Sequence, residues 1–188
     1  MTASTRVRPW RTEDADALAA AVRASLPELM RWLPWCHRDY DRRDAEQWIV
    51  LSLRAWAARS EFPLGVFDAD GTVIGGVGIN RIDWTTRSGN LGYWIATPHS
   101  RHGHARSAAR QAAELGFHTL GLQRLEIRTA PDNHPSQHVA QALGAHRQSP
   151  TPQRPRPRGE PGDTVIYLLT AADLDGGGME GGSAACGL

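Results

Sequence analysis

The chain has 188 residues and a formal net charge of +1, which suit one soluble globular domain and give no general basic surface for nucleic acid. All 21 basic residues are arginines, so a Schiff-base lysine, a lysine base and the lysine of a nucleotide P-loop are excluded. Two distant cysteines make no disulfide framework, and without an apolar membrane span or signal core we expect a cytoplasmic protein that binds no membrane.

The N-terminal region predicts a strand and then helices. Residues 5–10 are predicted as a short strand, and Thr12 is a plausible N-cap because two acidic residues follow it in the first turn. The helix should run to about Ser25. The next stretch, LPELMRWLPWCHRDY, is aromatic and interrupted by two prolines, which predicts a short helix followed by a loop.

A second long helix should begin at Asp41 or Asp44. Its apolar residues recur at steps of three and four, the spacing of one helix face. This periodicity predicts one buried face, made of Trp48, Leu51, Ala55 and Ala58.

Three strands should follow, over residues 62–68, 72–83 and 88–96. The dipeptide Asp70-Gly71 is a hairpin turn signal between the first two. Glycines inside the second strand predict a bulge or a close backbone approach, and they are Gly75, Gly76 and Gly78.

The C-terminal half predicts alternating helices and strands. A helix should run through Phe117, and a short helix should begin at Asn133 or Ser136 and end at Gly144. The predicted strands are 124–130, 145–148 and 164–170.

Two segments lack a regular pattern. Residues 148–162 contain five prolines and are expected to be irregular, and the chain from Gly176 is glycine-rich. We expect one domain over 1–174 and a disordered tail over 175–188. The order of elements predicts an α/β fold with mostly antiparallel strands early and crossover helices late.

The stretch TPHSRHGHARSAAR, residues 97–110, has three interpretations. A metal site is disfavoured, because no Cys, Asp or Glu accompanies the histidines in the loop. A nucleic-acid-binding site is disfavoured, because the local arginines are not part of a wider basic surface. The favoured interpretation is an anion cradle, since Gly103 stands between a strand and a helix whose first N–H groups are free. A plain strand-to-helix junction stays open as an alternative.

The segments LGYW, LGLQRLEIR, PDNHPS and ALGA, together with the turn around Gly103, resemble the core of the GCN5-related N-acetyltransferases (GNAT). The most similar branch is that of the ribosomal-protein N-terminal acetyltransferases of the RimJ and RimL type, and the resemblance extends over most of the chain. It implies the GNAT fold, with a central mixed, mostly antiparallel twisted sheet, splayed middle strands and flanking helices. It implies acetyl-coenzyme A as donor and no metal.

The resemblance also assigns cofactor contacts. The phosphate-binding turn of the family falls on residues 100–105, with Ser100 at a position where glutamine or arginine is usual. A backbone N–H near Ile95 or Ala96 should polarise the thioester carbonyl and stabilise the oxyanion. The other expected cofactor-binding residues are Arg101, His102, Gly103, His104, Ala105, Arg106, Asn133 and Ser136.

The resemblance and the residues themselves also indicate catalytic and acceptor groups. Ser136 matches a serine that protonates the leaving thiolate, although a serine there could also cap its own helix. Tyr93 and Glu126 are candidates for the base, and either could face the other side of the sheet. The acceptor site should contain an apolar wall made of Trp32, Trp35 and Tyr40, and a cluster of these rings in the core is the alternative.

The expected reaction is acetyl transfer to a primary amine, first of all a protein N-terminus such as that of a ribosomal protein. A small-molecule amine and a non-catalytic acetyl-coenzyme A-binding module are the alternatives. We expect no nucleic-acid partner, and a homodimer is common in the family.

Overall fold

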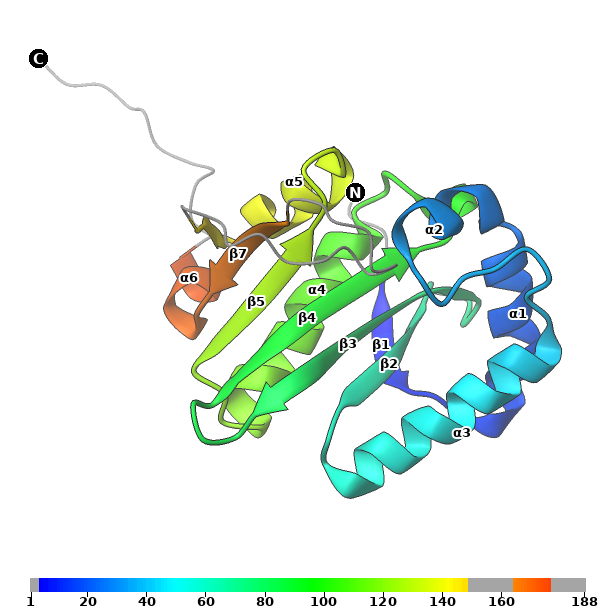
Figure 1. The fold of residues 1–188 in the computed structure, drawn as a ribbon, viewed down its shortest axis with the longest axis horizontal. Coiled ribbons are helices and arrows are strands. Elements are labelled where there is room, and N and C mark those ends of the chain that lie inside the picture. The colour runs from blue at the N-terminus through cyan, green and yellow to red at the C-terminus, as the bar shows by residue number, and fades with distance from the viewer. Residues whose placement is uncertain (1–3, 149–163, 177–188) are drawn as a thin grey trace, which may run out of the picture.

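The computed structural model describes residues 4–148 and 164–176 (Figure 1). The proline-rich segment from residue 149 and the glycine-rich tail from residue 177 lie outside the described residues. In the described ranges, no helix combines the length and the apolar character that crossing a bilayer requires.

Seven strands form one open sheet in the order β1-β2-β3-β4-β5-β7-β6. Every neighbouring pair is antiparallel except β4 and β5, which are parallel. This confirms the predicted mixed, mostly antiparallel sheet. The strands are β1 Arg6–Pro9, β2 Phe62–Phe67, β3 Val73–Asp83, β4 Ser88–Ile95, β5 Arg124–Thr129, β6 His146–Arg147 and β7 Val165–Leu169.

Helices flank this sheet, as Figure 1 shows. They are α1 Ala15–Arg23, α2 Leu26–Trp32, α3 Arg42–Ala58, α4 His104–Glu114, α5 His134–Ala142 and α6 Ala171–Gly176. A π-helical turn over Leu115–Thr119 continues α4. The sequence pattern did not predict α6, which runs two residues past the boundary expected at 174 and buries Leu174 completely.

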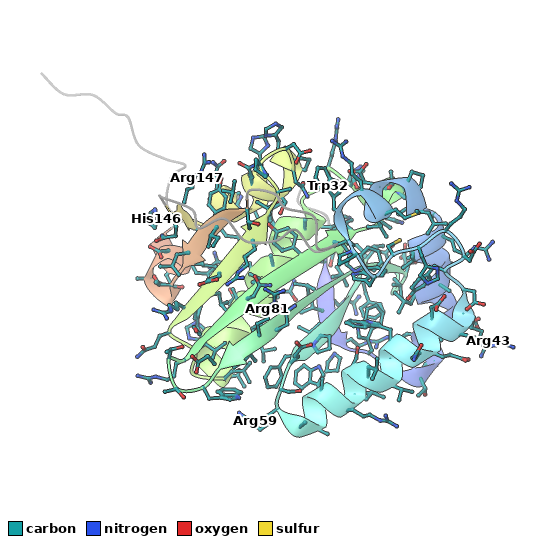
Figure 2. All side chains as sticks on the ribbon, in the orientation of Figure 1. Trp32, Arg43, Arg59, Arg81, His146 and Arg147 are labelled. Carbon is teal, nitrogen blue, oxygen red and sulfur yellow. The ribbon has the colours of Figure 1, made fainter. Side chains whose placement is uncertain are left out.

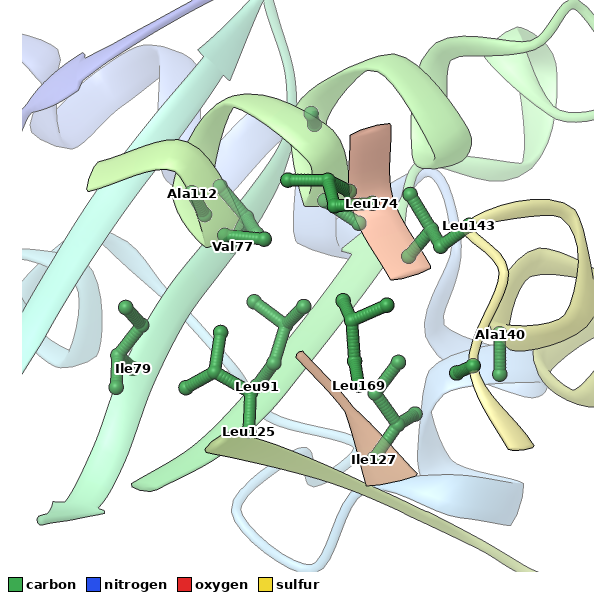
Figure 3. Close-up of a cluster of buried hydrophobic side chains, with 14 of the residues drawn as sticks. Val77, Ile79, Leu91, Ala112, Leu125, Ile127, Ala140, Leu143, Leu169 and Leu174 are labelled. Atoms are coloured by element: carbon green, nitrogen blue, oxygen red, sulfur yellow. The ribbon is translucent and has the colours of Figure 1, made fainter. Parts of the chain in front are cut away.

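Two hydrophobic cores lie on opposite faces of the sheet. In the first (Figure 3), fully buried alanines of α4 let this helix pack closely on residues such as Leu91 and Leu125. The second core joins α1, α3 and the far end of the sheet, with Trp94 packed against it. Since Leu91 and Trp94 belong to the same strand at odd and even positions, the alternation of side chains along β4 separates the two cores.

The predicted buried face of α3 is wrong by one residue. Ala45, Ile49 and Ser52 are buried, whereas Trp48 and Leu51 are 42% and 50% exposed. Two stripes of residues run side by side on this helix, one through Ala45 and Ile49 and the other through Trp48 and Leu51. Both have the spacing of a helix face, so periodicity alone does not distinguish them. The stripe with the small Ala45 packs into the second core, which leaves the tryptophan stripe outside it.

The start of α1 also differs from the prediction. Thr12 does not cap the helix, because a 3-10 turn over Thr12–Asp14 comes first. The carboxylate of Asp14 accepts the N–H of Arg11 at 2.8 Å and pairs with both terminal nitrogens of Arg8 at 2.7 and 2.8 Å. The charged side chain of Asp14 therefore stabilises the turn that Thr12 was expected to cap.

The Arg8–Asp14 pair gives a stability prediction. Burial raises the pKa of Asp14, but the bonds from Arg8 and the Arg11 amide outweigh it, and the pKa lies below its ordinary value. A carboxyl with a lowered pKa in the folded state stabilises the protein above its unfolded pKa, and this stability is lost as pH falls through the folded pKa. Asp14→Asn should lower the free energy of unfolding by about 1.5–3 kcal/mol at pH 7.

Urea unfolding of both proteins at pH 7 and pH 3 checks this. The difference between wild type and Asp14→Asn should shrink at pH 3, where the wild-type carboxyl begins to take up its proton. A difference of equal size at the two pH values would contradict the assignment.

Candidate active site

Strands β4 and β5 separate soon after they begin. Their parallel pairing covers only Ser88 to Asn90 against Arg124 to Glu126. Beyond Asn90 the strands draw apart toward the loops that precede α4 and α5 (Figure 1). The splayed middle strands that the GNAT resemblance implies are therefore present.

The register of β4 decides which amides face this gap. The N–H of Ala96 donates to the carbonyl of Ile74 on β3 at 2.8 Å. Hydrogen-bonded and non-bonded pairs alternate along an antiparallel ladder, so Trp94 also points its N–H at β3, whereas Tyr93 and Ile95 point theirs at β5. The Ala96 N–H is therefore occupied by Ile74, whereas the Ile95 N–H is directed at the gap.

The turn before α4 forms a concave backbone. Arg101 and Gly103 adopt left-handed conformations with φ of 65° and 84°, and Gly103 is the N-cap of the helix. The first bond of the helix runs from the Ser107 N–H to the Gly103 carbonyl at 3.0 Å, so the amides of residues 104–106 precede it. Alternating backbone of this kind directs successive N–H groups at one anion.

The histidines of this turn do not converge. His104 is buried and its Nδ1 lies 2.9 Å from the Thr5 hydroxyl, while the rings of His99 and His102 stand 6.4 and 6.2 Å from its ring. Burial, and then the neighbouring His99 and His102, lower the pKa of His104. No group of three metal-ligating side chains occurs among the residues that the structure describes.

Ser25 is a positioning residue that the sequence pattern did not reveal. It is 1% exposed, and its hydroxyl accepts the N–H of Thr97 at 2.8 Å. This bond ties the chain just after β4 to the connection between α1 and α2, 72 residues earlier in the chain. No local signal marks Ser25, because its partner is distant in sequence.

The cap of α5 is made by Asn133 and not by Ser136. The side chain of Asn133 accepts the N–H of Ser136 at 3.2 Å and caps the helix, so the Ser136 hydroxyl is not the cap. That hydroxyl lies 3.3 Å from the phenol oxygen of Tyr93, which donates to the Ser136 carbonyl at 2.9 Å. Burial raises the pKa of Tyr93, so the phenol stays neutral at pH 7.

The two candidate bases lie on opposite faces of the sheet. Tyr93 faces α5, whereas Glu126 stands opposite Asn90 in the register and shares its face. Glu126 also accepts hydrogen bonds from the Nε and Nη2 of Arg128, at 2.9 and 2.5 Å. The structure therefore does not bring the two side chains together.

A pocket of about 350 Å³ opens between α3 and the sheet. Trp35 and Tyr40 line it, as expected. Trp32 does not, because its Nε1 donates to Glu28 at 2.9 Å and it lies at the edge of the molecule away from α3 (Figure 2). Trp48, on the stripe of α3 that stays outside the core, lines the pocket instead.

A family model described as an acetyltransferase (GNAT) domain matches residues 5–146. The chain belongs to the GNAT acetyltransferase family. An uncharacterized N-acetyltransferase, p20 of Bacillus licheniformis, is 27% identical over 173 residues, which cover 90% of this chain and 94% of that protein.

Solved structures agree with this GNAT assignment. A "putative ribosomal-protein-serine acetyltransferase" from Vibrio cholerae has a TM-score of 0.77 and 30% identity, with 90% of this chain and 95% of that chain covered. RimL, a ribosomal L7/L12 acetyltransferase in complex with coenzyme A, has a TM-score of 0.80 at 18% identity, with 93% and 97% covered, and shows the shared fold. The chain is accordingly an acetyl-CoA-dependent N-acetyltransferase.

The residues of this GNAT domain fit acetyl-CoA. The left-handed residues Arg101 and Gly103 shape an anion cradle, and the amides of Tyr93 and Ile95 have no strand partner within the described chain. Amides without a strand partner need another acceptor, which an extended amide-bearing arm can supply. Ser100, where the chain departs from the family pattern, donates to the Ala96 carbonyl at 3.4 Å and so has a local role in the turn.

Proposed function

We propose that this acetyltransferase transfers the acetyl group of acetyl-CoA to the primary amine of a protein N-terminus. Relatives named for ribosomal-protein acetylation support this acceptor class. The observation that carries the transfer step is the position of Ile95. It lies at the edge of the gap between β4 and β5, on the strand that also lines the pocket. A small-molecule amine is the second candidate, because the pocket volume is near the lower end for ligand sites, about 300–1,000 Å³.

The backbone would bind and orient the donor. Bound acetyl-CoA supplies an activated acetyl group. The amides of residues 104–106 bind its pyrophosphate, with Arg101 and Arg106 as charged donors at the rim. Asn133 contacts the cofactor beyond β5 while its side chain caps α5. The Ile95 N–H donates to the thioester oxygen and stabilises the negative charge that grows on it as the amine attacks.

Side chains would transfer the protons that the amine loses and the thiolate gains. The amine nitrogen bonds to the acetyl carbon while the carbon–sulfur bond breaks, so the amine loses one proton and the thiolate gains one. Ser136 donates to the thiolate, and Tyr93 holds the Ser136 hydroxyl in place. Glu126 is the candidate acceptor of the amine proton, because it lies on the pocket face of the sheet where β4 and β5 separate.

A thiol-release assay tests this function. Acetyl-CoA is offered with a panel of N-terminal peptides and small amines, and mass spectrometry locates the acetyl group on the product. We expect turnover on amines with acetylation at the α-amino group of peptides. Tight acetyl-CoA binding without transfer to any acceptor would overturn the proposal in favour of a binding module.

A further inference from the structure

The pocket keeps large aromatic surfaces open to solvent. Trp35 and Trp48 line it and are 41% and 42% exposed. Trp94 meets Trp35 edge-on, with ring centroids 6.1 Å apart and planes at 60°. Burying these rings against each other would have stabilised the fold, so their exposure in a concave site indicates a ligand with an apolar surface of its own.

The floor of the pocket is made of glycines, and part of it is open. A Cβ at Gly76 would lie 2.6 Å from the Nε1 of Trp94, so the indole covers that glycine. A Cβ at Gly92 would meet only the Asn90 amide nitrogen, at 4.0 Å. The space beside Trp94 is therefore free down to the backbone of β4, which suits a flat group.

The charges that line the pocket are acidic. Asp44 and Glu61 contribute carboxylates, and His37 approaches Asp44 at 3.5 Å. No arginine is among the described residues that line it, although the chain has 21. This arrangement favours a cation and disfavours an acceptor that carries its own carboxylate.

The open floor adjoins the gap between β4 and β5. Gly92 and Trp94 alternate along the strand with Tyr93 and Ile95, whose amides face that gap. An amine held over Gly92 would therefore lie close to the carbonyl that Ile95 is proposed to bind.

We propose that the acceptor carries an aromatic ring beside its primary amine, an inference that rests on the proposed acetyl transfer. The ring packs against Trp35, Trp48 and Trp94 over Gly92, and the two acidic groups attract the ammonium before it loses its proton. Two sources share this chemistry. One is a peptide or protein that begins with an aromatic residue, and the other is a small arylalkylamine.

Peptides that differ only in their first residue test the inference. With Ala, Leu, Phe or Trp at position 1, kcat/KM should be about tenfold to hundredfold higher for the aromatic peptides than for the alanine peptide. Phenethylamine and propylamine form the small-molecule pair and identify the source. Phenylalanine amide should be a better acceptor than free phenylalanine, because the free acid adds a negative charge to a pocket that Asp44 and Glu61 already make acidic.

Two variants link the preference to the pocket. Trp48→Ala removes an aromatic wall and Gly92→Val fills the open floor, and each should bring the aromatic-to-alanine ratio of kcat/KM toward one. Trp84→Ala is the matched control, because Trp84 is also 42% exposed but lies outside the pocket, so this variant should keep the wild-type ratio. Thermal melts and acetyl-CoA titration establish that each variant is folded.

The outcomes separate the two proposals. Acetyl transfer with no aromatic preference, or a preference that survives both Trp48→Ala and Gly92→Val, overturns the inference and leaves the proposed function standing. Absence of transfer to every amine overturns both.

Discussion

Replacing Ser136 by alanine should lower kcat about a hundredfold while leaving the KM for acetyl-CoA within about twofold of wild type. General acid–base groups contribute roughly 10²–10⁴-fold, and the lower end applies because a thiolate is already a good leaving group. The hydroxyl makes no capping bond, since Asn133 satisfies the helix amide. The melting temperature of Ser136→Ala should therefore match that of the wild type.

Asn133→Ala provides the contrasting variant. Loss of this cap should lower stability by about 1 kcal/mol, which corresponds to a fall of roughly 2–4 °C in melting temperature for a chain of this size. Steady-state kinetics with both substrates and thermal melts of the two variants give the comparison. If Ser136→Ala lost stability and activity together, as Asn133→Ala is expected to lose stability, the proton-donor role would be wrong.

Replacing Gly103 by valine should weaken acetyl-CoA binding roughly tenfold to hundredfold. Gly103 has a φ of 84°, and holding a non-glycine residue in such a conformation costs about 1–3 kcal/mol. Because the amides after Gly103 are proposed to bind the pyrophosphate, this strain should mainly lower the affinity for acetyl-CoA. Isothermal titration with acetyl-CoA measures it directly.

Gly121→Val is the matched control for backbone strain. Gly121 has a φ of 73° and open space around it, but it lies in the loop before β5, outside the site. It should lose comparable stability and keep its affinity for acetyl-CoA. Equal losses of affinity in the two variants would show that Gly103 acts through global stability and not through the cradle.

Much of this fold could be predicted because its signals are local. Asp41 caps α3 with bonds to the amides of Arg43 and Asp44, and Gly103 begins α4, both as the sequence indicates. The resemblance to the GNAT family added the splay of β4 and β5, which periodicity does not contain.

The predictions that failed required knowledge of a distant partner. Thr12 lost its capping role to Asp14 because Arg8 and Arg11 hold that carboxylate. Trp32 was grouped with Trp35 by proximity in sequence, but α2 ends between them and directs Trp32 toward Glu28.

The sequence by itself determined the order of the elements up to β7 and the glycine turn before α4, because each depends on backbone preferences within a few residues. Only the tertiary structure decided which stripe of α3 enters the core, which amides of β4 face the gap, and that Tyr93 and Glu126 lie on opposite faces. A period of 3.6 or 2 fixes which residues share a face, but the face that is covered depends on what packs against it. The tryptophan stripe that we expected in the core is for this reason a wall of the pocket.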